Sequence, residues 1–125
     1  MNRHVFSTHL TNLAHDRFAL TQLKPQEFAN LYHQIINSFN ITADGQDWYL
    51  IGTDGCHLCD EIASLLHQIK QTRPLPHIHH LELIDSQDDT VINGLGVLIP
   101  ILLTPKQLLC YPFGIMDILT LHTHD

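Results

Sequence analysis

The stretch Tyr49-Leu-Ile-Gly-Thr-Asp-Gly-Cys-His-Leu-Cys-Asp-Glu61 joins a short apolar run to a segment with two cysteines three residues apart. Residues 48–52 form a compact apolar run, which is typical of a buried strand. After the first cysteine, apolar side chains recur at helical spacing over residues 57–71, and prolines follow the end of this segment. The sequence therefore predicts a strand, a cysteine pair and a helix in direct succession.

The elements after this unit predict the remainder of an α/β fold. Alternating polarity predicts a strand over 77–84, and a short helix is expected over 87–94. Two further strands, 99–103 and 107–111, flank a turn short enough for a hairpin, and a last helix covers 114–122. The order is β-α-β-α-β-β-α. Because a βαβ unit has a parallel crossover and a hairpin is antiparallel, we expect a four-stranded mixed sheet with helices on its faces.

The first 46 residues have a different pattern, with no cysteine and no clear strand. Apolar residues from Phe28 to Phe39 form one helical stripe, and Pro25 suits a first helical position, so we predict a helix over 25–39. A weaker pattern predicts a helix over about 8–19. We therefore divide the chain into a helical N-terminal extension, 1–46, that packs on the core through this stripe, and a domain covering 47–125.

Composition limits the functions to consider. The chain of 125 residues is 44% hydrophobic and 15% charged, as expected of a globular protein. A net charge of −7 with six scattered Lys and Arg residues argues against binding to nucleic acids or anionic membranes. The longest apolar stretch, 97–103, is far shorter than the roughly 20 residues of a membrane span. Because the N-terminus lacks an apolar signal segment, we expect a cytoplasmic protein. The sequence does not predict an oligomeric state.

The cysteine pair is the strongest candidate for chemistry. Cys56 falls at the first turn of the predicted helix, where unpaired N–H groups and the helix dipole favour a thiolate. Cys59 lies one turn further on, close enough to attack a mixed disulfide formed at Cys56. The carboxylates of Asp54 and Asp60 oppose the helix end, whereas a protonated His57 assists it, so we expect only a modest lowering of the Cys56 pKa. The predicted redox group is the Cys56–Cys59 disulfide, with no other cofactor.

Other interpretations of the cysteines and histidines remain open. The pair could be structural, or it could contribute two ligands to a metal, although no second Cys-x-x-C is present. His77, His79 and His80 on one strand, and His122 and His124 near the C-terminus, also suit metal binding, but solvated histidines are the simpler interpretation. We predict no metal site. Cys110 is expected to be a small apolar filler.

Several motifs taken together resemble a known superfamily. The strand-Cys-x-x-Cys-helix unit, the order of elements after it and the Ile99-Pro100 dipeptide resemble the thioredoxin-like superfamily. Within it, residues 55–61, 99–103 and 108–113 resemble a family of short bacterial glutaredoxin-like proteins, and the resemblance covers about residues 47–122. It implies that Pro100 is a cis-proline beside the disulfide, that Ile99 offers its backbone to an extended substrate, and that Gly114 belongs to a substrate-binding stretch.

The leading functional prediction is a thiol–disulfide oxidoreductase with a Cys-His-Leu-Cys active site, acting on a protein or small-molecule disulfide. Glutathione is a doubtful partner. The glutathione-using glutaredoxins commonly have Pro-Tyr between the cysteines and a lysine shortly before them, whereas this chain has His57-Leu58 and Asp54 there. Such a site gains no electrostatic attraction for an anionic tripeptide. The alternatives are a non-catalytic thioredoxin-like binding or regulatory module and, third, a metal-binding protein.

Overall fold

The computed structural model describes the backbone of residues 1–124 and the side chains up to Leu121. Its elements are α1 (Arg3–His15), the 3-10 helix η1 (Ala19–Gln22), α2 (Pro25–Asn37), β1 (Trp48–Gly52), α3 (His57–Thr72), β2 (Ile78–Glu82), the 3-10 helix η2 (Leu83–Asp85), α4 (Asp89–Leu95), β3 (Ile101–Leu103), β4 (Leu108–Cys110) and α5 (Ile115–His124). Among the described helices, none is both long enough and apolar enough to cross a membrane.

The four strands form one mixed sheet in the order β2-β1-β3-β4. β1 and β2 are parallel, with Trp48 opposite Ile78 and Gly52 opposite Glu82. β3 runs antiparallel to β1, and β4 antiparallel to β3. The predicted α/β class, the four-stranded mixed sheet and the element order from residue 48 onward are therefore confirmed.

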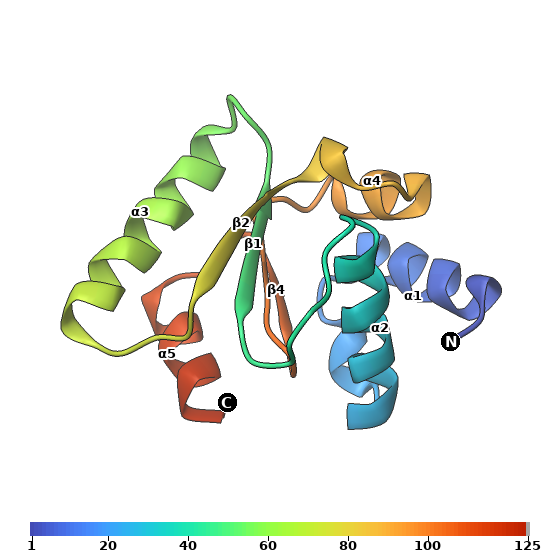
Figure 1. The fold of residues 1–125 in the computed structure, drawn as a ribbon, viewed down its shortest axis with the longest axis horizontal. Coiled ribbons are helices and arrows are strands. Elements are labelled where there is room, and N and C mark those ends of the chain that lie inside the picture. Colours follow the sequence, from blue (N-terminus) through green and yellow to red (C-terminus); the bar gives the residue numbers. More distant parts are fainter. Residues whose placement is uncertain (125) are drawn as a thin grey trace.

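Helices cover both faces of the sheet, as Figure 1 shows. α3 and α5 lie on one face, and α1, α2 and α4 lie on the other. Side chains of β1 alternate between these two layers: Trp48 and Leu50 join the core under α3 and α5, whereas Tyr49 and Ile51 join the core under the other three helices. This alternation follows from the two-residue period of a strand, and it explains why β1 is apolar along its whole length.

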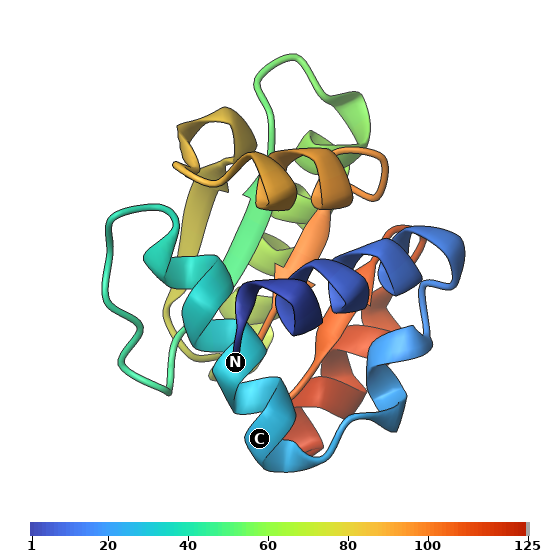
Figure 2. The same cartoon turned by 90° about the vertical axis from the view of Figure 1, so that its right-hand side faces the viewer.

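The N-terminal helices contribute a large part of the second core. Figure 2 shows α1, α2 and α4 lying across the near face of the sheet. The stripe on α2 is buried, and its members are Phe28, Leu31, Tyr32, Ile35 and Ile36. Phe6, Leu10 and Leu13 of α1 are buried in the same cluster as Ile101 and Leu103 of β3. Residues 1–46 and the sheet thus share one continuous apolar core.

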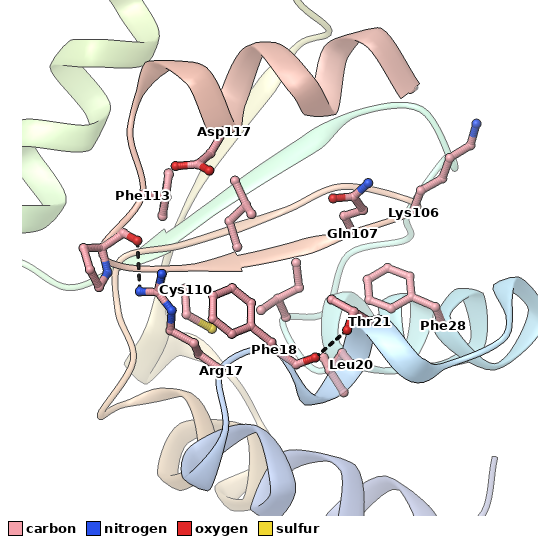
Figure 3. A pocket seen from close by; sticks show the side chains of 13 residues that line it. Arg17, Phe18, Leu20, Thr21, Phe28, Lys106, Gln107, Cys110, Phe113 and Asp117 are labelled. Atoms are coloured by element: carbon pink, nitrogen blue, oxygen red, sulfur yellow. Dashed lines mark hydrogen bonds between the residues drawn. The ribbon is translucent and has the colours of Figure 1, made fainter.

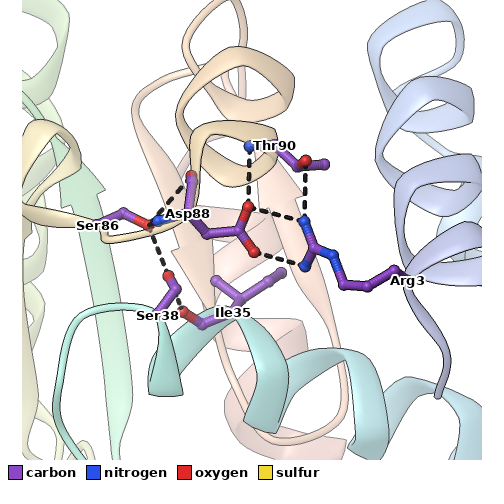
Figure 4. A network of polar contacts seen from close by, with 6 residues as sticks. All are labelled: Arg3, Ile35, Ser38, Ser86, Asp88 and Thr90. Carbon is purple, nitrogen blue, oxygen red and sulfur yellow. Dashed lines mark hydrogen bonds and ion pairs between the residues drawn. The ribbon is translucent and has the colours of Figure 1, made fainter.

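A polar network at one end of this layer joins three helices (Figure 4). The guanidinium of Arg3, at the start of α1, donates two hydrogen bonds to the carboxylate of Asp88 at 2.6 and 3.0 Å and a third to Thr90. Asp88 caps the start of α4, where it accepts the N–H of Thr90. The hydroxyls of Ser38 and Ser86 are 2.7 Å apart and link the end of α2 to the same region.

Some element boundaries differ from those predicted. α1 spans residues 3–15 rather than 8–19, because the side chain of Asn2 accepts the N–H of Val5 and begins the helix early. The carboxylate of Asp16 then accepts the N–H of Phe18 and takes the backbone out of the helix, leaving the Phe18 side chain 59% exposed. β1 has the predicted bounds, whereas the other three strands are shorter than predicted, and the end of the 77–84 run forms η2.

Candidate active site

The two cysteines occupy the start of α3 and form a disulfide, with their Cα atoms 5.2 Å apart. Cys56 is the N-cap residue, and its sulfur accepts the N–H of Cys59 at 3.1 Å. This bond uses one of the N–H groups that a helix start leaves unpaired, so negative charge on the Cys56 sulfur would be stabilised there. Cys56 is half-buried, whereas Cys59 is buried with 7% exposure. The sulfur atoms therefore differ in access to a reaction partner.

Two glycines shape the connection between β1 and the disulfide. Gly55 has φ +79° and lies in a turn closed by a hydrogen bond from the N–H of Cys56 to the carbonyl of Thr53, a conformation that favours glycine. Gly52 is required for a different reason, since a Cβ at this position would lie 2.8 Å from the sulfur of Cys59. The close approach of the β1 backbone to Cys59 thus depends on the absence of a side chain.

A carboxylate from the neighbouring strand holds the same loop. Glu82 ends β2, and its Oε1 accepts the hydroxyl of Thr53 at 2.5 Å and the N–H of Asp54 at 3.2 Å. Because β1 and β2 are parallel, their C-terminal ends meet at one edge of the sheet, which places Glu82 beside the loop that leads to Cys56. Glu82 therefore fixes the backbone on the approach to the disulfide.

The three residues expected to modulate the Cys56 pKa lie at the protein surface beside it. Asp54 and Asp60 are exposed, and Asp60 stands in the first turn of α3, where an acidic side chain stabilises the helix. The His57 side chain is 86% exposed, and its Nε2 lies 3.0 Å from Oε1 of Glu61 one turn further on. Glu61 thus offsets any positive charge that His57 brings to the site.

Ile99 and Pro100 reach the same end of the sheet through strand register. Ile51 of β1 is paired with Ile101 of β3 in the antiparallel direction, which brings Pro100 opposite Gly52. Pro100 is buried, the Ile99–Pro100 peptide bond is cis as the resemblance implies, and the carbonyl of Pro100 accepts the N–H of Tyr111 at 3.1 Å. A second cis peptide bond, Tyr111–Pro112, lies just after the end of β4.

Gly114 lies beyond this segment, immediately before α5. Its N–H donates to Oδ2 of Asp117 at 2.9 Å, and its carbonyl accepts the N–H of Ile118. The residue therefore precedes α5 as its N-cap, and Asp117 makes the one half of a capping box that is open to a glycine N-cap. An added Cβ on Gly114 would meet no atom within 4 Å, so open space adjoins this position.

A pocket of about 280 Å³ lies next to the buried cysteine, between α3 and the end of β2. Its walls include the carboxylate-bearing residues Asp54, Asp60 and Glu82, together with Cys59 and His80. Three carboxylate-bearing residues thus line a pocket that adjoins one cysteine of the disulfide.

His77, just before β2, and His79, on β2, contact aromatic rings and a carboxylate. His77 and His79 share one face, as predicted for a strand, with ring centroids 4.5 Å apart. His79 stacks on Tyr49, and its Nε2 lies 2.7 Å from Oδ2 of Asp47. Among the side chains that the structure describes, no three His, Cys, Asp or Glu residues converge on a possible metal position. The side chains of His122 and His124 lie outside the described part.

Cys110 lies away from the disulfide, on the other side of the sheet. It lines a pocket of about 110 Å³ between η1 and β4, together with Arg17, Phe18, Phe28 and other residues shown in Figure 3. Its thiol is unpaired and 5% exposed, and burial raises its pKa to about 11. The prediction that Cys110 fills apolar space agrees with this environment.

Comparisons of the chain with protein-family models, curated proteins and solved structures find no match in any of the three. The class of site therefore follows from its own geometry: a Cys-x-x-C disulfide at the start of a helix that follows a central strand. Two residues of this site, Gly52 and Glu82, were not singled out from sequence. A glycine that ends an apolar strand can mark a close backbone approach, and that was the available signal for Gly52.

Proposed function

We propose that this chain is a thiol–disulfide oxidoreductase of the thioredoxin-like superfamily, similar to glutaredoxins, with Cys56 as nucleophile and Cys59 as resolving thiol. The observation that carries the proposal is the different environment of the two sulfur atoms. Cys56 is the accessible partner and caps the helix, whereas Cys59 is buried one turn behind it. This arrangement suits attack on an external disulfide by Cys56, followed by release of the product through Cys59.

The position of Pro100 supports the same proposal. In the superfamily that the motifs resemble, a cis-proline adjoins the disulfide, and here the cis Ile99–Pro100 bond lies opposite the end of β1 that leads to Cys56. The backbone of Ile99 would then pair with an extended substrate, and Gly114 would border the same surface. The mixed sheet with α3 and α5 on one face also agrees with a thioredoxin-like domain beginning at about residue 47.

The test compares two serine variants in two assays. One assay follows reaction with a synthetic disulfide, and the other follows catalysis of insulin reduction by dithiothreitol. Cys59→Ser should accumulate a mixed disulfide at Cys56, detected by mass spectrometry, because the resolving thiol is gone. Cys56→Ser should form no such adduct and should lose turnover. The matched control is Cys110→Ser, which removes the third thiol and should retain turnover.

The reduction potential of the Cys56–Cys59 couple completes this test. Equilibration with defined thiol buffers, followed by alkylation and mass spectrometry, should show a single two-electron transition. A potential near that of thioredoxin, about −270 mV, indicates a reductant, and one near −120 mV indicates an oxidant. If the pair forms no disulfide, or if the wild type reduces neither disulfide, the chain is not an oxidoreductase. A non-catalytic binding module predicts no turnover in the wild type and a partner that Cys56→Ser still binds, and stoichiometric bound metal would indicate a metal site.

A further inference from the structure

Negative charge is concentrated at the end of the molecule that carries the disulfide. The C-terminal ends of the parallel strands β1 and β2 meet there, and Figure 1 shows the loop before α3 together with η2 and the start of α4 at this end. The segments that follow the two strands, 53–61 and 82–89, contain no Lys or Arg. They carry seven carboxylates, namely Asp54, Asp60, Glu61, Glu82, Asp85, Asp88 and Asp89.

The Lys and Arg side chains of the protein are paired with a carboxylate, lie on the face of the sheet opposite α3, or lie far from the disulfide. Arg3 is paired with Asp88, whereas Arg17 donates to the carbonyl of Pro112, stacks on Phe18 and lines a pocket with Cys110 on the face opposite α3. Lys70 and Arg73 lie at the far end of α3, about 20 Å from its first turn at 1.5 Å per residue. Lys24 precedes α2, and Lys106 lies in the turn between β3 and β4, at the opposite end of β3 from Pro100. Net negative potential therefore surrounds the reacting sulfur atoms.

A pocket beside the disulfide is lined by three of these carboxylate-bearing residues. The space of about 280 Å³ beside Cys59 is lined by Asp54, Asp60 and Glu82. Glu82 is held in place by Thr53 and by the N–H of Asp54, so one wall of the pocket is fixed by hydrogen bonds. Cys59 lines this pocket and its sulfur is bonded to that of Cys56, so a substrate sulfur that reacts with Cys56 stands next to the pocket and a short chain can carry an ammonium group into it.

We propose that the Cys56–Cys59 site selects disulfides flanked by positive charge, with the cationic group bound in the pocket of Asp54, Asp60 and Glu82, and that it disfavours anionic disulfides such as glutathione disulfide. The inference rests on the proposed oxidoreductase function. The cationic group can belong to a small aminothiol disulfide or to a lysine beside a cysteine in a peptide.

The reaction consists of two exchanges. The Cys56 thiolate attacks one sulfur of the substrate, so that a Cys56–substrate bond forms, the substrate S–S bond breaks, and the leaving thiolate takes up a proton. Cys59 then gives its proton to solvent and attacks Cys56; the Cys56–Cys59 bond forms and the second substrate thiol leaves. Two electrons pass from the protein dithiol to the substrate disulfide. The cationic group of the substrate stays within the acidic surroundings through both exchanges.

The experiment uses the reduced full chain and three disulfides: cystamine, which is cationic, bis(2-hydroxyethyl) disulfide, which is neutral, and glutathione disulfide, which is anionic. Stopped-flow rate constants are divided by those of the 2-mercaptoethanol thiolate with the same disulfide, which removes intrinsic reactivity. At 10 mM salt we expect cystamine to exceed glutathione disulfide by about 10- to 100-fold. At 1 M salt the ratio should approach one, because the screening length falls from about 30 Å to about 3 Å.

Substitutions test whether Asp54 and Asp60 produce the preference for cationic disulfides. In 0.1 M salt, Asp54→Asn combined with Asp60→Asn should lower the normalised cystamine rate and raise that of glutathione disulfide, reducing their ratio by about 3-fold or more. Glu27→Gln is the control, since Glu27 also stands in the first turn of a helix, but at the start of α2, which Figure 1 shows at the opposite end of the molecule from the loop before α3. This control should leave the ratio unchanged. A peptide pair with lysine or glutamate on both sides of a mixed disulfide should follow the same order if peptides are the source.

The outcomes separate this inference from the proposed function. If the protein reduces the neutral disulfide but treats cystamine and glutathione disulfide alike at 10 mM salt, the charge selection is wrong and the oxidoreductase proposal stands. The same conclusion follows if Glu27→Gln changes the ratio as much as the double variant. If the neutral disulfide is not reduced at all, the oxidoreductase proposal itself is wrong.

Discussion

Gly52→Ala tests whether the close approach of β1 to Cys59 determines the packing of the site. The added Cβ would lie 2.8 Å from the Cys59 sulfur and 3.0 Å from its Cβ, so β1 or the first turn of α3 must shift. Such overpacking typically costs about 1–3 kcal/mol of stability. Gly114→Ala is the comparison variant, because its Cβ meets no atom within 4 Å and only the replacement of a glycine N-cap by alanine is expected to cost stability, at about 0.5–1 kcal/mol.

A double-mutant cycle assigns this cost to the sulfur. The wild type, Gly52→Ala, Cys59→Ala and the double variant are unfolded in urea, all fully reduced so that the disulfide does not contribute. Removal of the sulfur eliminates the shorter of the two contacts, so the cost of Gly52→Ala should fall by at least about 0.5 kcal/mol in the Cys59→Ala background. An equal cost in both backgrounds would refute the reasoning, as would a Gly114→Ala variant that is destabilised to the same extent.

Three further predictions concern the rest of the chain. Burial raises the pKa of Cys110 to about 11, so its thiol should resist iodoacetamide at pH 8 in the native reduced protein, whereas Cys56 should react. Peptide mass spectrometry measures the labelling, and equal labelling of the two cysteines would contradict this prediction. The hydrogen bond from Arg3 lowers the pKa of Asp88, so the pair stabilises the fold above the unfolded pKa of about 3.9 and loses this effect as the pH falls through the lowered folded pKa. Arg3→Ala should lower the urea midpoint at pH 7, and its difference from the wild type should shrink as the pH falls below about 3.9; an equal difference at every pH would contradict this. Tyr32→Phe removes the hydroxyl that donates to the carbonyl of Asp47 and should cost about 0.5–1.5 kcal/mol in urea unfolding; no change would show that the bond contributes nothing.

The parts of the fold that could be predicted from sequence are those with a strong local period. The apolar run of β1, the helical stripe of α2 and the cysteine-to-helix junction at Cys56 each carry their signal within about 15 residues. The start of α1 could not be placed in this way, because it depends on one capping side chain, Asn2, rather than on the apolar pattern. Similarly, Asp16 ends that helix through a local bond that competes with helical geometry.

In the site, too, contacts between residues close in sequence could be predicted, whereas a contact between two strands could not. Cys56 and Cys59 are close in sequence, so their relation was evident before the structure. Glu82 reaches the loop before Cys56 from another strand, and only the parallel register of β1 and β2 brings them together. The sequence of β2 gives no sign that its last residue is an acceptor for Thr53, since a carboxylate after an alternating run also suits a solvated strand end.

The acidic surroundings of the disulfide affect two quantities that can be separated. Negative potential disfavours the Cys56 thiolate and so slows exchange with every disulfide, whatever its charge. The same potential attracts a cationic substrate and repels an anionic one, so its second effect changes sign with the substrate. A ratio of rates with two substrates therefore cancels the thiolate fraction and reports the potential alone. Carboxylates such as Asp60, which also stabilise the start of α3, can thus reduce the reactivity of the thiol while increasing its selectivity.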